Sequence, residues 1–469
     1  MKKFYAVVAA VLLGFCLFGA AGCSGPAGGF DGIGFSPVQP DFPAGIDLCE
    51  LAPPASINSR QDLSDFMDYC IFYPSTETRY AAVGEEYGRK LRDGFWEESL
   101  WAGQNGALSH NFWSVADTGR LSENLVGVRA ASFPYGYRGH ENAPEDVKVV
   151  NYIYYRDVIS EPRDRGYSLT DFPLYQKNKG FVPVGSSEQL FYAVQCGYMP
   201  VPEEGSAAEK ILSDALGILN RLLREDMTDL QKVQNIYQYI LCENTYDYEA
   251  VRHSEYEHFE FAAYFLEGVF EYHNAVCDGL TKTLVLLCGL EGIEAYHIGA
   301  VSNGSGHAYA YVNVCGQFYL CCPTRGSEVK PLDGLRYHCH TDAFFLTDYE
   351  TSSPSWGYAS DVRPAIGEQV KKVEKYDFWA RTKIETRSGE YNFSPDSADE
   401  AEAVLRTVGD AAKISGITMQ VELNCSYDTA NEAMSRIQNE YEVEKFNNGS
   451  FGGKLLYAFL FRAGKGGTA

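Results

Sequence analysis

The chain has 469 residues, of which 45% are hydrophobic, 14% aromatic and 22% charged, and this composition excludes a disordered or fibrous chain. At roughly 100–200 residues per domain, the length predicts about three globular domains. The formal net charge of −24 at pH 7 argues against nucleic acid and anionic lipid surfaces as partners, because an acidic protein surface repels phosphate.

The first 22 residues have the pattern of an export signal. Lys2 and Lys3 form a short basic start, an apolar stretch follows over residues 4–18, and small residues lead into Cys23. The apolar stretch is too short for a permanent transmembrane helix. The pattern resembles a bacterial lipoprotein signal, in which this cysteine receives lipid and becomes the new N-terminus. The resemblance implies an exported, membrane-anchored lipoprotein at the cell surface, and an ordinary cleaved signal is the alternative.

Composition and periodicity divide the rest of the chain. Residues 23–55 are rich in glycine, proline and small residues, which predicts a flexible spacer. Helical and alternating patterns then predict an α+β fold in three parts. These are an N-terminal α+β domain over 56–175, a larger domain over 180–350 and a small α+β domain over 380–465.

Capping residues mark several helix starts. A serine or threonine precedes a carboxyl or amide side chain three positions later, a pattern typical of helix N-termini. The sequence therefore predicts helices directly after Ser59, Ser186, Ser206, Thr228 and Ser397. Alternating apolar residues predict strands over 125–131, 147–153, 181–184, 295–301, 308–314, 317–321, 391–393 and 454–461.

Cys277 stands at the start of an apolar helix that ends near Gly289. Backbone N–H groups and the dipole at a helix start stabilise a thiolate. The position therefore predicts that the pKa of Cys277 is lowered from its usual ~8.5 toward neutrality, which would make it a nucleophile.

The pairing of the strands after this helix can be worked out from one turn. If residues 315–316 form a two-residue turn, Val314 faces Gln317 and Tyr309 faces Cys322. His307 shares a strand face with Tyr309, because side chains on one face recur every second residue. We therefore expect Cys322 diagonally across from His307, within reach of the second ring nitrogen. A nucleophile, a base and a third group that orients the base form the constellation of a thiol enzyme.

These motifs resemble the bacterial transglutaminase-like superfamily, a branch of the papain-like thiol enzymes. The resemblance covers about residues 205–350. It rests on YD at 246–247, AVCDGL at 275–280, GI at 292–293, GHAY at 306–309, FY at 318–319, PT at 323–324 and FFLTD at 344–348.

The resemblance implies a papain-like core domain, flanked here by the two smaller α+β domains. It implies that Cys277 attacks a carbonyl group, that His307 is the base and that an aspartate orients the histidine, with no cofactor. The partner would be a protein or peptide substrate or ligand. Hydrolysis and transfer of the acyl group to an amine both remain open.

The chain departs from the family pattern at the third position. Cys322 stands where the family has its aspartate, 15 residues after His307, and a neutral thiol is a poor acceptor. Asn313, Asp333 and Asp342 are other candidate partners, but none has the expected spacing. The alternative to an enzyme is therefore a non-catalytic binding or scaffolding lipoprotein that has lost the acid of the triad.

The cysteines and histidines allow a further alternative. Cys321, Cys322, His338, Cys339 and His340 are of the types that ligate zinc, but their spacing matches no established zinc pattern, so we predict no metal. A disulfide involving Cys339 stays open. Without the signal and the lipid-bearing cysteine, the remaining number of cysteines is odd. At least one is therefore unpaired, and Cys277 is the candidate for it.

Overall fold

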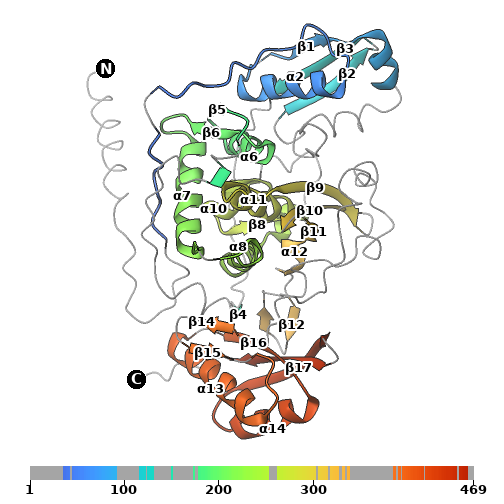
Figure 1. Ribbon diagram of the computed structural model, residues 1–469. Coiled ribbons are helices and arrows are strands. Elements are labelled where there is room, and N and C mark those ends of the chain that lie inside the picture. Colours follow the sequence, from blue (N-terminus) through green and yellow to red (C-terminus); the bar gives the residue numbers. More distant parts are fainter. Residues whose placement is uncertain are drawn as a thin grey trace, which may run out of the picture.

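The structure is a computed structural model, and it shows structured regions in the N-terminal, middle and C-terminal parts of the chain (Figure 1). The elements are helices and small sheets, so the mixed α+β class predicted from the sequence is confirmed. The residues described are 35–42, 45–75, 77–91, 116–122, 124–130, 149–151, 173–174, 178–225, 227–252, 261–302, 305–314, 317–326, 330–332, 335–337, 384–386, 389–391, 393–416, 418–451 and 454–462.

In the N-terminal region a helix packs on a small sheet, and the described residues 85–91 are also helical. Helix α2 (Arg60–Phe72) begins after Ser59, whose hydroxyl accepts a hydrogen bond from the N–H of Asp62 at 3.1 Å. This confirms the predicted helix start. The sheet has the order β1-β3-β2, with β1 (Arg79–Ala82), β3 (Leu125–Ala130) and β2 (Ala116–Ser122).

The segment that precedes α2 differs from the sequence-based prediction. Residues 35–42 and 45–55 were predicted as part of a flexible spacer, but the N–H of Val38 donates to the carbonyl of Ser213, and the N–H of Cys49 donates to that of Phe181. Partly buried hydrophobic residues such as Phe35 and Phe42 pack against the core. Widely spaced apolar side chains anchor this segment, although it lacks the periodicity of a helix or strand.

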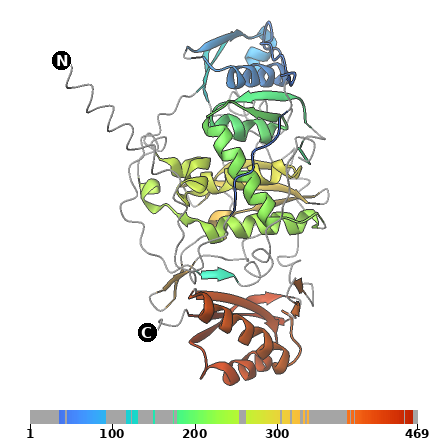
Figure 2. The ribbon, with the colours of Figure 1, turned by 90° about the vertical axis from the view of Figure 1, so that its left-hand side faces the viewer.

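Helices dominate the middle region (Figure 2). The predicted starts at Ser186, Ser206 and Thr228 are all confirmed, because each side chain accepts a hydrogen bond from the backbone three residues later. The helical elements are α6 (Ser187–Cys196), α7 (Ala207–Leu222), α8 (Asp229–Glu243), α9 (Tyr248–Arg252), η4 (Ala262–Tyr264), α10 (Leu266–Phe270), α11 (Cys277–Leu290) and α12 (Pro323–Gly326).

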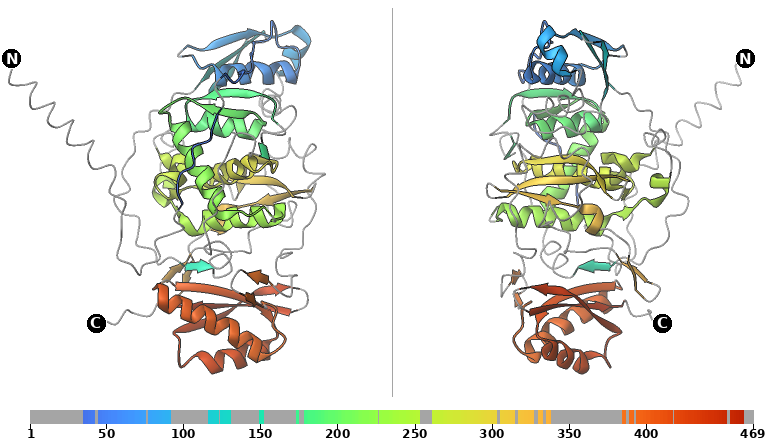
Figure 3. Two further views of the ribbon diagram at one scale, coloured as in Figure 1. Left: turned by 60° about the vertical axis from the view of Figure 1, so that its left-hand side comes forward. Right: turned by 90° about the vertical axis from the view of Figure 1, so that its right-hand side faces the viewer.

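The strands of the middle region form several small sheets. The antiparallel sheet β11-β10-β9 comprises β9 (Ala295–Ser302), β10 (Ser305–Val314) and β11 (Gln317–Cys321), and it lies beside the helices in Figure 3. The other pairs are β5 (Phe181–Val184) with β6 (Met199–Pro202), β7 (Thr245–Tyr246) with β8 (Asn274–Ala275), and β12 (Lys330–Leu332) with β13 (Leu335–Tyr337).

Helix α11 is the centre of the hydrophobic core. Leu280, Leu284 and Leu287 are fully buried along it, and burying a leucine side chain stabilises a fold by about 1.5–3 kcal/mol. The cluster of buried apolar residues extends from Ile57 to Cys321 and therefore includes both the N-terminal and the middle region. The domain boundary near residues 175–180 stays a prediction.

The C-terminal region has its own core, which extends from Phe393 to Phe461. Its sheet has the order β17-β18-β16-β4. Helix α13 starts after Ser397, as predicted. The elements are β14 (Ile384–Thr386), β15 (Gly389–Tyr391), α13 (Ala398–Ser415), β16 (Thr418–Cys425), α14 (Tyr427–Ile437), β17 (Val443–Phe451) and β18 (Lys454–Phe461).

Strand β4 (Val149–Asn151) joins this C-terminal sheet, although it was predicted within the N-terminal domain over 56–175. It pairs in parallel with β16, with Val149 opposite Thr418. Periodicity predicted the strand correctly, but it carries no information about which partner a strand finds.

None of the helices in the described ranges is long and apolar enough to cross a bilayer. The predicted signal over residues 1–22 and the lipidation site Cys23 lie outside the described residues.

Candidate functional site

Cys277 is the first residue of α11, and backbone contacts on both sides of it fix its position. The preceding residues 274–275 form β8, which pairs in parallel with β7 and so places Tyr246 opposite Ala275. The N–H of Val276 donates to the carbonyl of Ala263 at 3.0 Å. Val276 makes no side-chain capping hydrogen bond, and the backbone N–H groups of Cys277 and Asp278 instead donate to the hydroxyl of Tyr246 and to the Cys277 thiol.

Gly279 explains part of the motif around the cysteine. A Cβ atom at this position would lie 2.4 Å from the carbonyl oxygen of Ala263 and 2.9 Å from that of Phe265. Both are backbone atoms and cannot rotate away. Only glycine therefore lets the first turn of α11 approach the segment that precedes α10.

The predicted register of the next strands is confirmed. Val314 pairs with Gln317, and the ladder continues to Ala310 and Cys321, so the next position places residue 322 opposite Tyr309. The Nε2 atom of His307 lies 3.3 Å from the Sγ atom of Cys322. The side chain of Cys322 is fully buried, so this thiol fills the position beside the far ring nitrogen.

The start of β10 lies against Cys277. The thiol of Cys277 is hydrogen-bonded to the backbone of Ala308, the residue directly after His307. The ring of His307 packs edge-on against Tyr309, with centroids 4.5 Å apart. The structure therefore brings the predicted nucleophile next to the strand position that carries the predicted base.

The predicted lowering of the Cys277 pKa is wrong. Burial first, and then the negative charge of Asp278, raise the pKa of this half-buried thiol to about 12. Hydrogen bonds from the backbone of Ala308 and Asp278 and from the hydroxyl of Tyr246 oppose this rise without outweighing it. The helix start alone does not activate the thiol, so a thiolate forms here only if a neighbouring base accepts the proton.

Two tyrosines beside the thiol were not predicted as site residues. Burial raises the pKa of Tyr246 well above its usual range, and burial raises the pKa of Tyr264 to about 12. Both hydroxyls therefore stay protonated at neutral pH, and that of Tyr246 can donate toward Cys277 or a group bound to it. The sequence signal was the YD motif at 246–247, which belongs to the resemblance.

Three other residues were candidate partners of His307, and the described part of the structure shows none of them beside its ring. The side-chain N–H of Asn313 donates to Glu294 at 2.9 Å, so its amide is engaged away from the histidine. Asp333 and Asp342 lie outside the described residues, as do His338, Cys339 and His340. Within the ranges that the structure describes, no group of three or more His, Cys, Asp and Glu side chains could hold a metal ion.

The cysteines whose side chains the structure describes are not in disulfides. They include Cys277 and Cys322, and also Cys321, which is fully buried on the opposite strand face. The cysteines whose side chains are described are Cys49, Cys70, Cys196, Cys277, Cys288, Cys321, Cys322 and Cys425.

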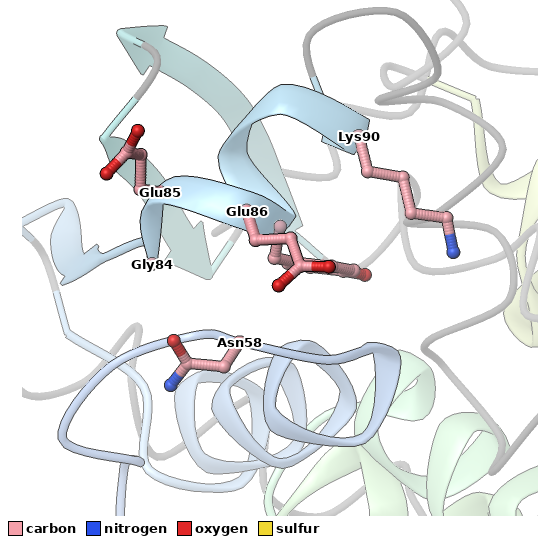
Figure 4. Close-up of a pocket in the computed structure, with 6 residues that line it drawn as sticks. Asn58, Gly84, Glu85, Glu86 and Lys90 are labelled. Carbon is pink, nitrogen blue, oxygen red and sulfur yellow. The ribbon is translucent and has the colours of Figure 1, made fainter.

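A cavity of about 480 Å³ lies in the N-terminal region, away from this site (Figure 4). In the close-up, the amide of Asn58 and the carboxylate of Glu86 lie on opposite sides of the opening. None of its lining residues belongs to the set around Cys277, so it is not the substrate cleft of that site. The lining residues are Asn58, Gly84, Glu85, Glu86, Tyr87 and Lys90.

Comparison with known proteins gives little support of its own. No family model matches the chain, and no curated protein matches it. Among solved structures, the chain is similar to one described as the crystal structure of a TGase, with 12% sequence identity and a TM-score of 0.21. The similarity covers 54% of this chain and 53% of that chain, which is about half of its length. At this level it carries no argument about the site, which rests on the geometry above.

Proposed function

We propose that this chain is a transglutaminase-like thiol enzyme that hydrolyses or transfers an amide group of a protein or peptide through an acyl-Cys277 intermediate. One observation carries the proposal. The thiol at the start of α11 bonds to the backbone next to His307, while the far nitrogen of that histidine has a side-chain partner at 3.3 Å in Cys322. This is the order of groups that a nucleophile, its base and an orienting residue require.

The chemistry follows from these positions. The thiol proton of Cys277 passes to His307 as the sulfur attacks the carbonyl carbon of the amide. In this proposal, the hydroxyl of Tyr246, which contacts the Cys277 thiol, and the backbone N–H groups at the start of α11 stabilise the oxyanion that forms. The amine leaves with a proton from His307, and water or a second amine then releases the acyl group and restores the thiol.

The experiment that tests the proposal is to trap the acyl-enzyme. The purified protein would be incubated with a glutamine-containing peptide library and a biotin-labelled amine, and both the mass of the Cys277 peptide and the labelled products would be measured. We expect an acyl adduct on Cys277 that is absent in Cys277→Ala and strongly reduced in His307→Gln. Wild-type protein that gives no adduct, no product and no more cleavage than Cys277→Ala contradicts enzyme function.

A second candidate function is favoured by one specific observation. A neutral, fully buried thiol at Cys322 cannot balance the charge of a protonated His307 as a carboxylate does. A non-catalytic binding or scaffolding protein that retains the fold would show this substitution. In that case, peptides bind to the protein without turnover, and binding is unchanged in Cys277→Ala.

We also propose that the protein is a cell-surface lipoprotein anchored through Cys23. The support is the basic start, the apolar stretch and the small residues before this cysteine. Replacing Cys23 by Ala should move the protein from the membrane fraction to the soluble fraction and abolish incorporation of labelled palmitate. A Cys23→Ala protein that stays in the membrane fraction would show that the anchor lies elsewhere.

A further inference from the structure

A network of three ionisable side chains, two of them almost fully buried, begins at the residue after Cys277, and the proposed chemistry uses none of them. The ammonium of Lys282 is 2.7 Å from one carboxylate oxygen of Asp278, and Nε2 of His297 is 2.6 Å from the other. The side chains of Lys282 and His297 are each only 3% exposed. Asp278 immediately follows the nucleophile in the chain.

The close contact between Asp278 and His297 connects the helix start to the sheet that carries the base. His297 belongs to β9, which pairs along its length with β10, the strand of His307. In that ladder Ala310 is opposite His297 and Ala300 is opposite His307. The contact between Asp278 and His297 therefore links the residue after the nucleophile to the strand next to the base.

Lys282 connects the same carboxylate to a third element. Its ammonium donates to the carbonyl of Tyr264 at 2.9 Å and lies 4.8 Å from the ring centroid of Phe265. Tyr264 is close enough to Cys277 for the charge on its sulfur to affect the tyrosine hydroxyl. The network thus joins α11, β9 and the segment before α10 around the thiol.

The charge of Asp278 does not serve to activate the nucleophile. Burial opposes ionisation of its carboxyl group, but Lys282 and His297 lower the pKa of Asp278 well below its usual range. The resulting negative charge raises the pKa of Cys277. A carboxylate in this place makes the thiolate less favourable, and buried ion pairs add little net stability. Its remaining role is to fix geometry.

We propose that Asp278 is a positioning residue that holds Cys277 at a fixed place relative to His307 through its close contacts with His297 and Lys282. The inference rests on the proposed function, because it assigns a role in the same site. It predicts that the N–H donor at position 297 matters more than the identity of the ring.

The matched variants are His297→Gln and His297→Leu. Glutamine can present an N–H donor near the place of Nε2, whereas leucine fills space without a donor. Rates of Cys277 alkylation by iodoacetamide between pH 6 and 10, kcat and KM for a turned-over amide, and the melting temperature would be measured for each. We expect His297→Leu to lower the alkylation rate and kcat by about ten- to a hundredfold with KM nearly unchanged, and His297→Gln to restore most of the loss.

Removing Asp278 alone would leave the buried charge of Lys282 unpaired and could prevent folding, so a double variant is used. Asp278→Asn combined with Lys282→Met removes both charges of the pair. Since the field of Asp278 is gone, the pH profile of Cys277 alkylation should shift to lower pH, while kcat falls. Full kcat in this variant, or equal losses in His297→Leu and His297→Gln, would overturn the positioning role. A different result would overturn the proposed function and the positioning role with it. This result is that loss of His307 slows alkylation of Cys277 no more than alkylation of the other thiols.

Discussion

The Nε2 atom of His307 and the Sγ atom of Cys322 are 3.3 Å apart, a separation at which the two groups share a hydrogen bond. The transglutaminase-like pattern has an aspartate at this position. A thiol of this kind holds the ring in place but supplies no negative charge to a protonated histidine. The contact between two members of the proposed triad is therefore present, and the charge that an aspartate would supply is missing.

The first prediction restores the missing charge. In Cys322→Asp, the new carboxylate would stand next to Nε2 and stabilise the imidazolium that forms when Cys277 gives up its proton. We expect faster alkylation of Cys277 and faster amide turnover, by on the order of 10²–10⁴-fold at most. The control is Cys322→Asn, which has nearly the same shape without charge. A folded Cys322→Asp protein whose Cys277 reactivity and turnover stay at the wild-type level would favour the binding protein.

The second prediction concerns Gly279, two positions after Cys277. In Gly279→Ala, the new Cβ would meet the carbonyl oxygen of Ala263 at 2.4 Å, so the first turn of α11 must move. We expect a loss of stability of about 1–3 kcal/mol together with slower alkylation of Cys277. Gly217→Ala in α7 is a matched control, since its Cβ would meet the carbonyl oxygen of Ser36 at the same 2.4 Å, on a helix that does not carry the thiol. Both variants should melt earlier, but only Gly279→Ala should lose reactivity.

The third prediction tests Tyr246 as an oxyanion donor. Tyr246→Phe keeps the ring that packs 5.0 Å from Tyr248 and removes the hydroxyl beside Cys277. We expect kcat to fall by about 10²-fold with little change in KM, as for loss of one such donor. Tyr248→Phe removes a hydroxyl from the neighbouring, exposed ring and should leave kcat unchanged. Equal kcat in wild type and Tyr246→Phe would remove Tyr246 from the mechanism.

Local signals predicted much of this structure correctly. The helix starts after Ser59, Ser186 and Thr228 follow from hydrogen bonds within one turn, so the sequence contains all that is needed. The same holds for the register of β10 and β11, where one short turn fixes every later pair. The contact between His307 and Cys322 could therefore be predicted from residues 307–322 alone.

What could not be predicted depends on residues distant in the chain. The parallel pairing of β4 with β16 joins strands more than two hundred residues apart, and no periodicity encodes such a choice. The pKa of Cys277 depends on burial by the whole fold and on the charge of Asp278. The partners of Asp278 are only partly local, because Lys282 is one helical turn away but His297 arrives from a strand.

The fourth prediction comes from a buried pair of glutamates outside the site. The hydroxyl oxygen of Ser187 lies 3.0 Å from Glu188 and 2.9 Å from Glu267, and both carboxyl groups are buried. A serine hydroxyl has one proton and can donate to only one of them, so the second contact requires a proton on a carboxyl group. Burial first, and then the charge of Glu188, raise the pKa of Glu267 to about 8, which makes it the protonated partner.

The sign of the pH dependence follows from this pKa. Between the ordinary pKa of a glutamate, about 4.3, and the value of about 8 in the folded chain, the folded state holds a proton that the unfolded state has lost. The stabilising contribution is therefore fully present below the lower value and is lost as the pH rises through about 8. Within this window, the free energy of unfolding falls by up to about 1.4 kcal/mol per pH unit for one proton.

Glu267→Gln should remove this dependence, because a glutamine amide can donate toward Ser187 at any pH. Urea unfolding of wild type and variant at pH 6, 7, 8 and 9 would measure it, with Glu204→Gln, an exposed carboxyl group, as the control. Between pH 6 and 8, we expect the free energy of unfolding of Glu267→Gln to change less with pH than that of wild type, and its excess over wild type to be greatest at pH 8 and 9. Since wild type and Glu267→Gln share all other titrating groups, the difference between their two slopes isolates the proton of Glu267. Parallel slopes in wild type and Glu267→Gln would mean that Glu267 is ionised throughout this range.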